Sequence, residues 1–318
     1  MWISILLLLV GLALVVFGAD YLVDGASGIA RRFGLSEFVI GLTIVGMGTS
    51  APEMVVSFIG AIQGNADIAI GNVVGSNIMN TLLILGVTAL ILPMGITPAN
   101  KKQDIPVNII ITVLLILLGL EKTLFGFGTD GLSTLDGGIL LVCFILYMWK
   151  CFTQKQETSG EEEPVKEHPV WLAILMIVGG IAGLAFGGRL FVNSATDIAK
   201  ALGVSDKFIA VTILAGGTSM PELATCVAAA VKKRGQLALG NIIGSNIFNI
   251  LLILGGSALI HPLSFQDISY VDLGALISSA IALLTCCYVG KKDQLDRLDG
   301  ALFLILWAAY MVYLFIQL

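Results

Sequence analysis

Charged residues are scarce in this sequence. Asp, Glu, Lys and Arg together make up 12% of the 318 residues, whereas 57% of the residues are apolar. Soluble domains carry roughly 25% charged residues, so the composition argues against a soluble globular domain. The net charge of −5 decides little, because the placement of basic residues is more informative than their sum in a chain of this composition.

Cysteine and histidine are also rare. The five cysteines have no metal-like spacing, and each of the two histidines precedes a proline in an expected loop. A disulfide framework is therefore not expected. Neither a His-Glu-x-x-His motif nor a cofactor fingerprint is present. The sequence thus predicts neither an enzyme nor a resident cofactor, and it gives no sign of a nucleic acid or an obligate protein as partner.

Long apolar runs occupy most of the chain. A helix needs about 20 mainly apolar residues to cross a bilayer, and ten such runs are present. We expect an all-α integral membrane protein of two five-helix units, residues 1–152 and 169–318, joined by a polar linker over 153–168 that is too short for a regulatory domain. The runs cover residues 2–30, 36–62, 66–92, 105–120, 136–152, 169–199, 205–231, 236–260, 268–290 and 297–317.

The basic residues are unevenly placed between these runs. If the first residue lies outside and ten spans follow, 13 of the 17 basic residues fall in inner loops, 3 fall outside, and Arg189 lies within a span. Lys and Arg collect on the cytoplasmic side of membrane proteins. The distribution predicts a multi-pass protein of a cell membrane, with both termini outside and the linker in the cytoplasm.

The two halves are related in sequence. Residues 41–80, aligned with residues 210–249 without gaps, match at 16 of 40 positions, and the matches are concentrated on polar residues and glycines. Shared hydrophobicity alone would not select those positions. Because each unit has an odd number of spans, the two copies must face opposite ways in the membrane. Inverted repeats are typical of secondary transporters, whose binding site lies near the membrane midplane.

A motif of the form Gly-Thr-Ser-x-Pro-Glu occurs once in each half, within an apolar run. Its proline removes one helical hydrogen bond and displaces the carbonyl four residues earlier. Its glutamate, Glu53 or Glu222, would lie at membrane depth, where carboxylates are costly and usually functional. Carboxylate, hydroxyl and freed carbonyl oxygens are the hard ligands that small cations prefer. The hydroxyls of the two copies belong to Thr49, Ser50, Thr218 and Ser219.

A second motif, Gly-Asn-x-x-Gly-Ser-Asn-Ile-x-Asn, follows on the next run of each half. Its Asn and Ser residues at four-residue intervals lie on one helix face. The glycines beside them allow a second helix to approach closely. We interpret the glycines as packing residues and the later polar residues of the stripe as lining an ion site. Those residues are Ser76, Asn80, Ser245 and Asn249.

The two motifs, each present twice, resemble the paired alpha repeats of the cation/calcium exchanger superfamily, in particular the sodium/calcium exchanger branch in its prokaryotic form without a regulatory domain. The resemblance implies alternating access by sliding of the first and sixth spans across a fixed core. It implies that Glu53 and Glu222 hold Ca²⁺ together with backbone carbonyls of Thr49 and Thr218. It further implies Na⁺ sites formed by Ser50, Ser219, Ser76, Ser245 and the carbonyls of Gly46 and Ala215.

One position departs from part of that superfamily. Its potassium-dependent branch has Asp at the position of Asn249, and Asn80 is the matching residue of the first repeat. An amide supplies an oxygen but no charge, so the formal charge of the site is −2 rather than −3. We therefore expect Na⁺/Ca²⁺ exchange that does not need K⁺.

Three other functions stay open on the sequence alone. A proton/calcium exchanger would also use two glutamates, although the Thr-Ser pairs favour Na⁺ coordination. A potassium-dependent exchanger would carry a third carboxylate, at the position of Asn249. A cation channel belongs to another class, and it would not need a carboxylate in each of two inverted copies. For the expected exchanger, Ca²⁺ and Na⁺ are the substrates, and a lipid bilayer is the surrounding.

Overall fold

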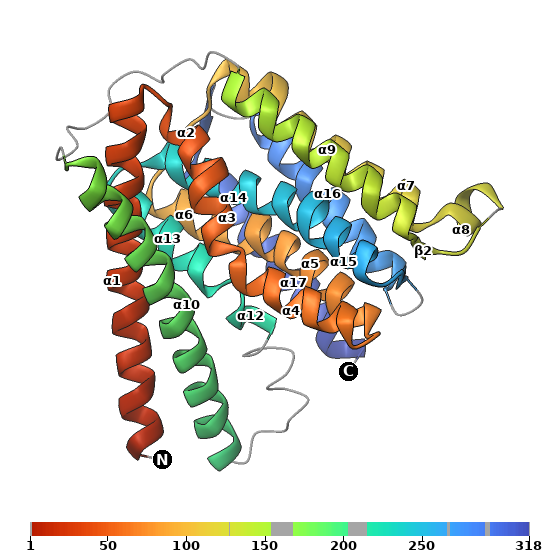
Figure 1. Ribbon diagram of the computed structural model, residues 1–318, viewed down its shortest axis with the longest axis horizontal. Helices are drawn as coiled ribbons and strands as arrows, with labels where there is room; N and C mark the ends of the chain where they lie inside the picture. Colours follow the sequence, from red (N-terminus) through yellow and green to blue (C-terminus); the bar gives the residue numbers. More distant parts are fainter. Residues whose placement is uncertain are drawn as a thin grey trace.

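The computed structural model describes residues 2–126, 128–153, 168–202, 215–265, 268–289 and 293–317. Helices account for most of them (Figure 1). The first half contains α1 (Trp2–Phe33), α2 (Glu37–Ile40), η1 (Gly41–Val45), α3 (Gly46–Thr49), α4 (Ala51–Ile62), α5 (Ala66–Met79), η2 (Asn80–Ile84), α6 (Leu85–Ile91), η3 (Asn100–Asp104), α7 (Ile105–Gly119), α8 (Glu121–Phe125) and α9 (Thr134–Thr153), where η marks a π-helical segment. The second half contains α10 (Val170–Ala201), α12 (Ala215–Gly217), α13 (Met220–Val231), α14 (Gly235–Phe248), η5 (Asn249–Leu254), α15 (Gly255–Ile260), α16 (Tyr270–Cys286) and α17 (Arg297–Gln317).

Apolar helices occur in each of the ten predicted runs. Seven helices in the described part of the chain are long and apolar enough to cross a membrane, and the bent pair Glu37–Thr49 and Ala51–Ile62 adds an eighth candidate. Two more apolar helices, Met220–Val231 and Tyr270–Cys286, are shorter. Residues 205–214 of the seventh run, and residues 154–167 of the predicted linker, lie outside the described residues.

Two helical spans form the centre of the molecule. In Ile68–Ile91 and Gly235–Ile260, 72% and 94% of the most apolar stretch is buried, against 11% to 33% in the other five long candidates. Helices that face lipid keep their apolar side chains exposed in a structure without a membrane, so these two spans are surrounded by the others. They carry the second motif of each half. Each also contains a π-helical segment that begins at Asn80 or Asn249, and such segments are frequent at functional sites.

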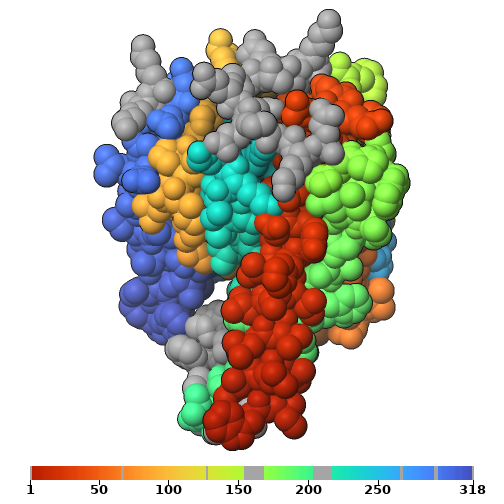
Figure 2. All heavy atoms as spheres, turned by 90° about the vertical axis from the view of Figure 1, so that its left-hand side faces the viewer, coloured from red at the N-terminus to blue at the C-terminus, as the bar shows by residue number. Residues whose placement is uncertain are grey.

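The long helices α1 and α10 run antiparallel along one side of the molecule (Figure 2, α1 in red and α10 in green). Glycines on both helices bring the two backbones into contact, as small residues do between membrane helices. The residue numbers rise along one helix as they fall along the other. A Cβ atom added to these glycines would lie 2.7–2.9 Å from a backbone oxygen of the other helix, in the pairs Gly11 with Gly187, Gly18 with Gly180, and Gly25 with Ala173.

Two pairs of very short strands supplement the helices, which the all-α prediction did not include. β1 (Met94–Gly95) pairs antiparallel with β4 (Gln294–Leu295), and β2 (Gly131–Leu132) pairs antiparallel with β3 (Leu263–Ser264). In each pair one strand comes from each half of the chain. Two-residue strands in loops leave no alternating pattern of apolar residues, so they could not be predicted from periodicity.

The predicted start of the fourth helical run was wrong by seven residues. Helical structure begins at Pro98 rather than at residue 105. Thr97 and Asn100 exchange two hydrogen bonds, from Thr97 N to Asn100 Oδ1 at 3.0 Å and from Asn100 N to Thr97 Oγ1 at 3.1 Å. This local cap at Thr97 starts the helix, which then continues through the polar Asn-Lys-Lys-Gln-Asp segment that reads as a loop by polarity alone.

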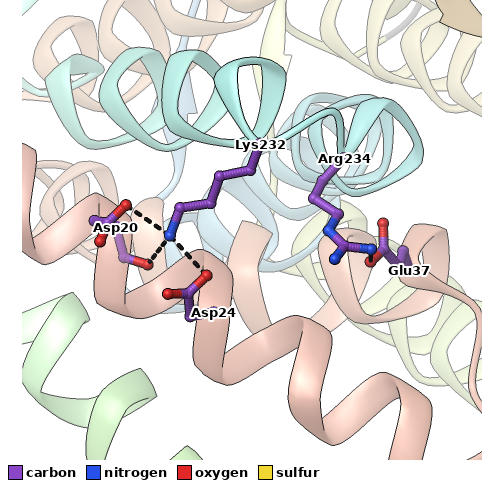
Figure 3. A network of polar contacts seen from close by, with 5 residues as sticks. All are labelled: Asp20, Asp24, Glu37, Lys232 and Arg234. Atoms are coloured by element: carbon purple, nitrogen blue, oxygen red, sulfur yellow. Dashed lines mark hydrogen bonds and ion pairs between the residues drawn. The ribbon is translucent and has the colours of Figure 1, made fainter. Parts of the chain in front are cut away.

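Four ion pairs lie on the side that the basic residues predict to be cytoplasmic. Lys232 Nζ lies 2.6 Å from carboxylate oxygens of both Asp20 and Asp24, which connects the end of α13 to α1 (Figure 3). Arg234 Nη1 lies 2.9 Å from Glu37 Oε1, and both of these side chains are buried (Figure 3). The fourth pair joins Lys101 Nζ and Asp293 Oδ1 at 3.2 Å.

Candidate ion-binding site

The two copies of the first motif interrupt their helices in the same way. The first break falls at Ser50, with φ −79° and ψ 6°, and the second at Ser219, with φ −87° and ψ 8°. A proline stands at the second position of each following helix, where its missing N–H leaves no helical partner unsatisfied. The first break bends the chain by 48°. Glu53 and Glu222 therefore occupy the first turn of α4 and α13.

The two glutamates are buried and are contacted by serines of the opposite half. Glu53 is 1% exposed and Glu222 is 0% exposed. Ser50 Oγ donates to Glu222 Oε1 at 3.0 Å, and Ser219 Oγ donates to Glu53 Oε1 at 3.1 Å. The two breaks thus lie next to each other, and each carboxylate is held from the other repeat.

One oxygen of each carboxylate has no hydrogen-bond partner among the described residues. These atoms, Glu53 Oε2 and Glu222 Oε2, are inaccessible to solvent. Buried polar atoms are almost always paired, and an unpaired buried carboxylate oxygen is especially costly. A bound cation would remove that cost.

Two asparagine amides present a second pair of unpartnered oxygens. Asn80 Nδ2 donates to Asn246 Oδ1 at 3.1 Å, and Asn249 Nδ2 donates to Asn77 Oδ1 at 2.9 Å. Asn80 Oδ1 and Asn249 Oδ1 are buried and have no partner among the described residues. With the amide nitrogens engaged between the two central helices, the oxygens are the atoms left for a ligand.

The remaining predicted residues surround this pair of breaks. Ser76 Oγ, one turn before Asn80, lies within hydrogen-bond distance of Ser219 Oγ at 3.2 Å. Gly46 O accepts from Ser50 N at 3.1 Å and from Ser245 Oγ at 3.3 Å. The backbone of Ala215 lies at the start of α12, two residues before the second copy of the first motif begins.

The threonine hydroxyls contact asparagines that the sequence-based site did not include. Thr49 Oγ1 donates to Asn241 Oδ1 at 3.1 Å, and Thr218 Oγ1 donates to Asn72 Oδ1 at 3.4 Å. Asn72 Nδ2 donates in turn to the backbone oxygen of Glu53 at 3.2 Å. The identity of Asn72 and Asn241 between the repeats is the available signal, but only the later polar residues of the stripe are assigned to the site from the sequence.

A second omitted pair lies where the central helices meet. Asn77 and Asn246 occupy equivalent positions in the two repeats, and Asn77 Nδ2 donates to Asn246 O at 3.1 Å. Asn246 Nδ2 also donates to Thr81 Oγ1 at 3.0 Å. These residues hold the amides of Asn80 and Asn249 in place, so they position the oxygens of the site.

The donor set consists of two carboxylates with hydroxyl, amide and carbonyl oxygens. Among the described residues there is no group of three or more His, Cys, Asp or Glu side chains. Such a set suits hard cations such as Na⁺ and Ca²⁺, whereas transition metals favour nitrogen and sulfur ligands.

Comparison with known proteins agrees with this chemistry. The family model "sodium/calcium exchanger protein" matches residues 3–153 and 172–316. This chain belongs to the sodium/calcium exchanger family. It is 39% identical to CaxA of Alkalimonas amylolytica over 99% of both chains, and 34% identical to the sodium/calcium exchanger MaX1 of Methanosarcina acetivorans over 98% of this chain and 99% of that one. A solved structure of the sodium-calcium exchanger NCX_Mj aligns over 98% of both chains with a TM-score of 0.84 and 34% identity.

Membership in the exchanger family confirms the expectation of a membrane antiporter with several transmembrane helices. The family is one of transporters and not of enzymes, and its members exchange cations with Ca²⁺.

A cavity leads towards the site of this exchanger from one side. It has a volume of about 310 Å³ and lies between α10 and the two broken helices. Pro52, Asn72, Thr218 and Pro221 form part of its lining, so it reaches the residues next to both glutamates. Figure 1 shows α10 passing beside α12 and α4 in this region.

Proposed function

We propose that the protein exchanges Na⁺ for Ca²⁺ across a cell membrane by alternating access, without a requirement for K⁺. One observation carries the proposal. Two buried glutamates, each bonded through one oxygen to a serine of the opposite repeat, keep their other oxygen unpartnered among the described residues. The family match supports the same conclusion, as does the similarity to MaX1 and NCX_Mj, both named as sodium/calcium exchangers.

The architecture that goes with this function is ten transmembrane helices in two inverted five-helix units. The units are residues 1–152 and 169–318, joined by a cytoplasmic linker over 153–168. The antiparallel course of α1 and α10, which are equivalent helices of the two units, supports the inversion. The reciprocal serine–glutamate contacts support it as well, because each has a counterpart at the equivalent positions.

In the proposed site, Ca²⁺ lies between Glu53 and Glu222 and takes backbone oxygens of Thr49 and Thr218. Na⁺ ions use the same carboxylates in part. The amide oxygens of Asn80 and Asn249 complete the oxygen lining. The further Na⁺ ligands are Ser50, Ser219, Ser76, Ser245 and the carbonyls of Gly46 and Ala215. Ca²⁺ and Na⁺ are substrates here, and no cofactor is part of the proposal.

The charge of the site explains why transport would be an exchange. An empty site with two carboxylates carries a charge of −2. To switch this site from one side of the membrane to the other, the protein must take two uncompensated charges past apolar residues, which costs several kcal/mol. One Ca²⁺ neutralises the site, and so do two Na⁺. Only the loaded forms then switch between the two sides, so the flux of one ion depends on the flux of the other.

The same charge argument sets the role of K⁺. Asn80 and Asn249 contribute oxygens without charge. Ca²⁺ and K⁺ together would leave +1 in a poorly solvated site, which is unfavourable. A third carboxylate would be needed to offset it, and none of the described polar residues around Glu53 and Glu222 provides one.

The test is uptake of radiolabelled Ca²⁺ into proteoliposomes that contain the purified protein. An outward Na⁺ gradient should drive uptake when K⁺ is replaced by choline on both sides. Loss of uptake on removing K⁺ would refute the K⁺ independence. Uptake that follows a pH gradient and ignores Na⁺ would replace the proposal with proton/calcium exchange, and Ca²⁺ flux without any opposing ion would indicate a channel.

A further inference from the structure

Arg189 lines the cavity that leads to the site. Its neighbours in the lining include Asn72 and Thr218, which contact each other beside Glu53. Among the described residues that form this lining, Arg189 is the one that carries a charge. A positive side chain is unexpected on an access route for cations, because it repels the substrates.

The charge of Arg189 is not neutralised within the described part of the chain. Its side chain is exposed, and none of the ion pairs or hydrogen bonds of the described residues involves it. A guanidinium keeps its proton at any physiological pH. The cavity therefore holds a full positive charge.

The repeat does not require a basic residue at this position. At the 169-residue offset between the two halves, Arg189 corresponds to Asp20. Asp20 lies 2.6 Å from Lys232, which also pairs with Asp24 (Figure 3). Equivalent positions thus carry opposite charges, and among the described residues only the acidic one has a partner of opposite charge. The arginine is specific to the side on which the cavity opens.

We propose that Arg189 determines how strongly Ca²⁺ competes with Na⁺ on that side of the membrane. The inference rests on the proposed function. The electrostatic energy of an ion in the cavity is its charge multiplied by the local potential. A potential that lowers the occupancy of a monovalent ion by some factor therefore lowers that of a divalent ion by the square of the factor. Arg189 disfavours both ions, and it disfavours Ca²⁺ more.

The size of the cavity sets the magnitude. A compact cavity of 310 Å³ is about 8 Å across, so an ion inside it lies within about one Debye length of the guanidinium. For a separation of about 10 Å in a water-like dielectric, one unit charge changes the occupancy of Na⁺ about twofold and that of Ca²⁺ about fourfold.

The experiment is a charge series at position 189, measured in sealed vesicles of each orientation. Half-saturating concentrations of Ca²⁺ and Na⁺ are determined for wild type, Arg189→Lys, Arg189→Gln and Arg189→Glu. On the side to which the cavity opens, Arg189→Gln should lower the value for Ca²⁺ about fourfold and that for Na⁺ about twofold. Arg189→Glu should produce about the square of each effect, and Arg189→Lys should keep the wild-type values.

Matched controls separate this effect from a loss of structure. Lys122→Gln removes the same charge from α8, outside the lining of this cavity, and should leave both values unchanged. Raising the ionic strength with choline chloride should reduce the differences within the series, because salt screens the potential.

Each outcome has a distinct meaning. Equal shifts for the two ions, equal shifts on both sides of the membrane, or unchanged values in Arg189→Gln would overturn the role of Arg189. Absence of Na⁺-dependent Ca²⁺ flux in the wild type would instead overturn the proposed function. The inference would be supported if the logarithm of the half-saturating concentration, plotted against the charge of side chain 189, had a slope for Ca²⁺ about twice that for Na⁺.

Discussion

At the residue scale, the glutamates differ from ordinary buried acids in what they lack. Buried carboxylates in proteins are usually paired with a basic residue or bonded through both oxygens. Glu53 and Glu222 have one serine hydroxyl each and one unpartnered oxygen among the described residues. The buried Glu37 provides the contrast within the same chain, because Arg234 neutralises it. The two site carboxylates are therefore left for a mobile cation.

Replacing either site glutamate by glutamine tests this assignment. Glu53→Gln or Glu222→Gln keeps the shape of the side chain and removes the charge that compensates dehydration of a divalent ion. Loss of one partner from a buried charge pair costs about 3–5 kcal/mol, so we expect Ca²⁺ uptake to fall at least about 100-fold, since each 1.4 kcal/mol is tenfold. The measurement is Na⁺-driven uptake of radiolabelled Ca²⁺ at matched protein content.

Glu121→Gln supplies the control for that experiment. It makes the same chemical change at the start of α8, away from the broken helices, and uptake should stay at the wild-type level. Thermal unfolding should show that both site variants are folded. Wild-type uptake in either of them would move the site away from that residue.

At the element scale, the contact between α1 and α10 depends on glycine. The two backbones approach so closely that a single added methyl group on one helix meets the main chain of the other. Small residues permit this approach between membrane helices. These are the first and sixth spans, which the family resemblance predicts to slide together, and close packing of the two backbones suits two helices that move as one body.

Adjacent glycines on α10 allow a matched test of that seam. A Cβ at Gly180 would lie 2.7 Å from Gly18 O, whereas a Cβ at Gly179 would meet no atom within 4 Å. Gly180→Ala should destabilise the protein by about 1–3 kcal/mol, because overpacking forces the backbones apart. Gly179→Ala should leave stability equal or higher, because alanine favours helix more than glycine does.

Thermal unfolding in detergent and Ca²⁺ uptake both serve as readouts for the glycine pair. We expect a lower Tm and slower uptake for Gly180→Ala and neither for Gly179→Ala. Equal behaviour of the two variants would mean that the seam is not as tight as the fold indicates.

The sequence predicted the helical runs well because lipid imposes length and apolarity on each of them. It predicted the broken helices through Pro52 and Pro221, since proline acts locally. It did not predict the start of the helix at Pro98, which depends on a reciprocal cap between Thr97 and Asn100. Nor did it predict that Asn77 would contact Asn246, because contacts between repeats depend on how the two halves meet in space and leave no local pattern.

At the scale of the whole molecule, the two halves contribute equivalent residues to the paired serine–glutamate and asparagine–asparagine contacts of the site. The chain even adopts a left-handed backbone at matching positions, with φ 73° at Gly64 and φ 57° at Lys233. The charges on the surrounding helices do not follow this symmetry. Lys232, which pairs with Asp20 and Asp24 on α1, corresponds to Gln63 in the first half. The symmetric contacts of the site thus lie among charges that differ between the two halves.

Those equivalent positions provide the test of inversion. In an inverted repeat, Gln63 and Lys232 must lie on opposite sides of the membrane, whereas a direct repeat would place them on the same side. The excess of basic residues in the loops that include Lys232 predicts that this side is cytoplasmic.

In a background without the five native cysteines, Gln63→Cys should react with an impermeant maleimide only from outside, and Lys232→Cys only from the cytoplasm. Two further variants calibrate the inner and outer reactions: Lys101→Cys near the start of the helix formed by η3 and α7, and Lys122→Cys in α8, just after that helix ends. Labelling of Gln63→Cys and Lys232→Cys from one side would contradict the inverted architecture, and labelling of all four variants with the two sides exchanged would keep the inversion but reverse the orientation.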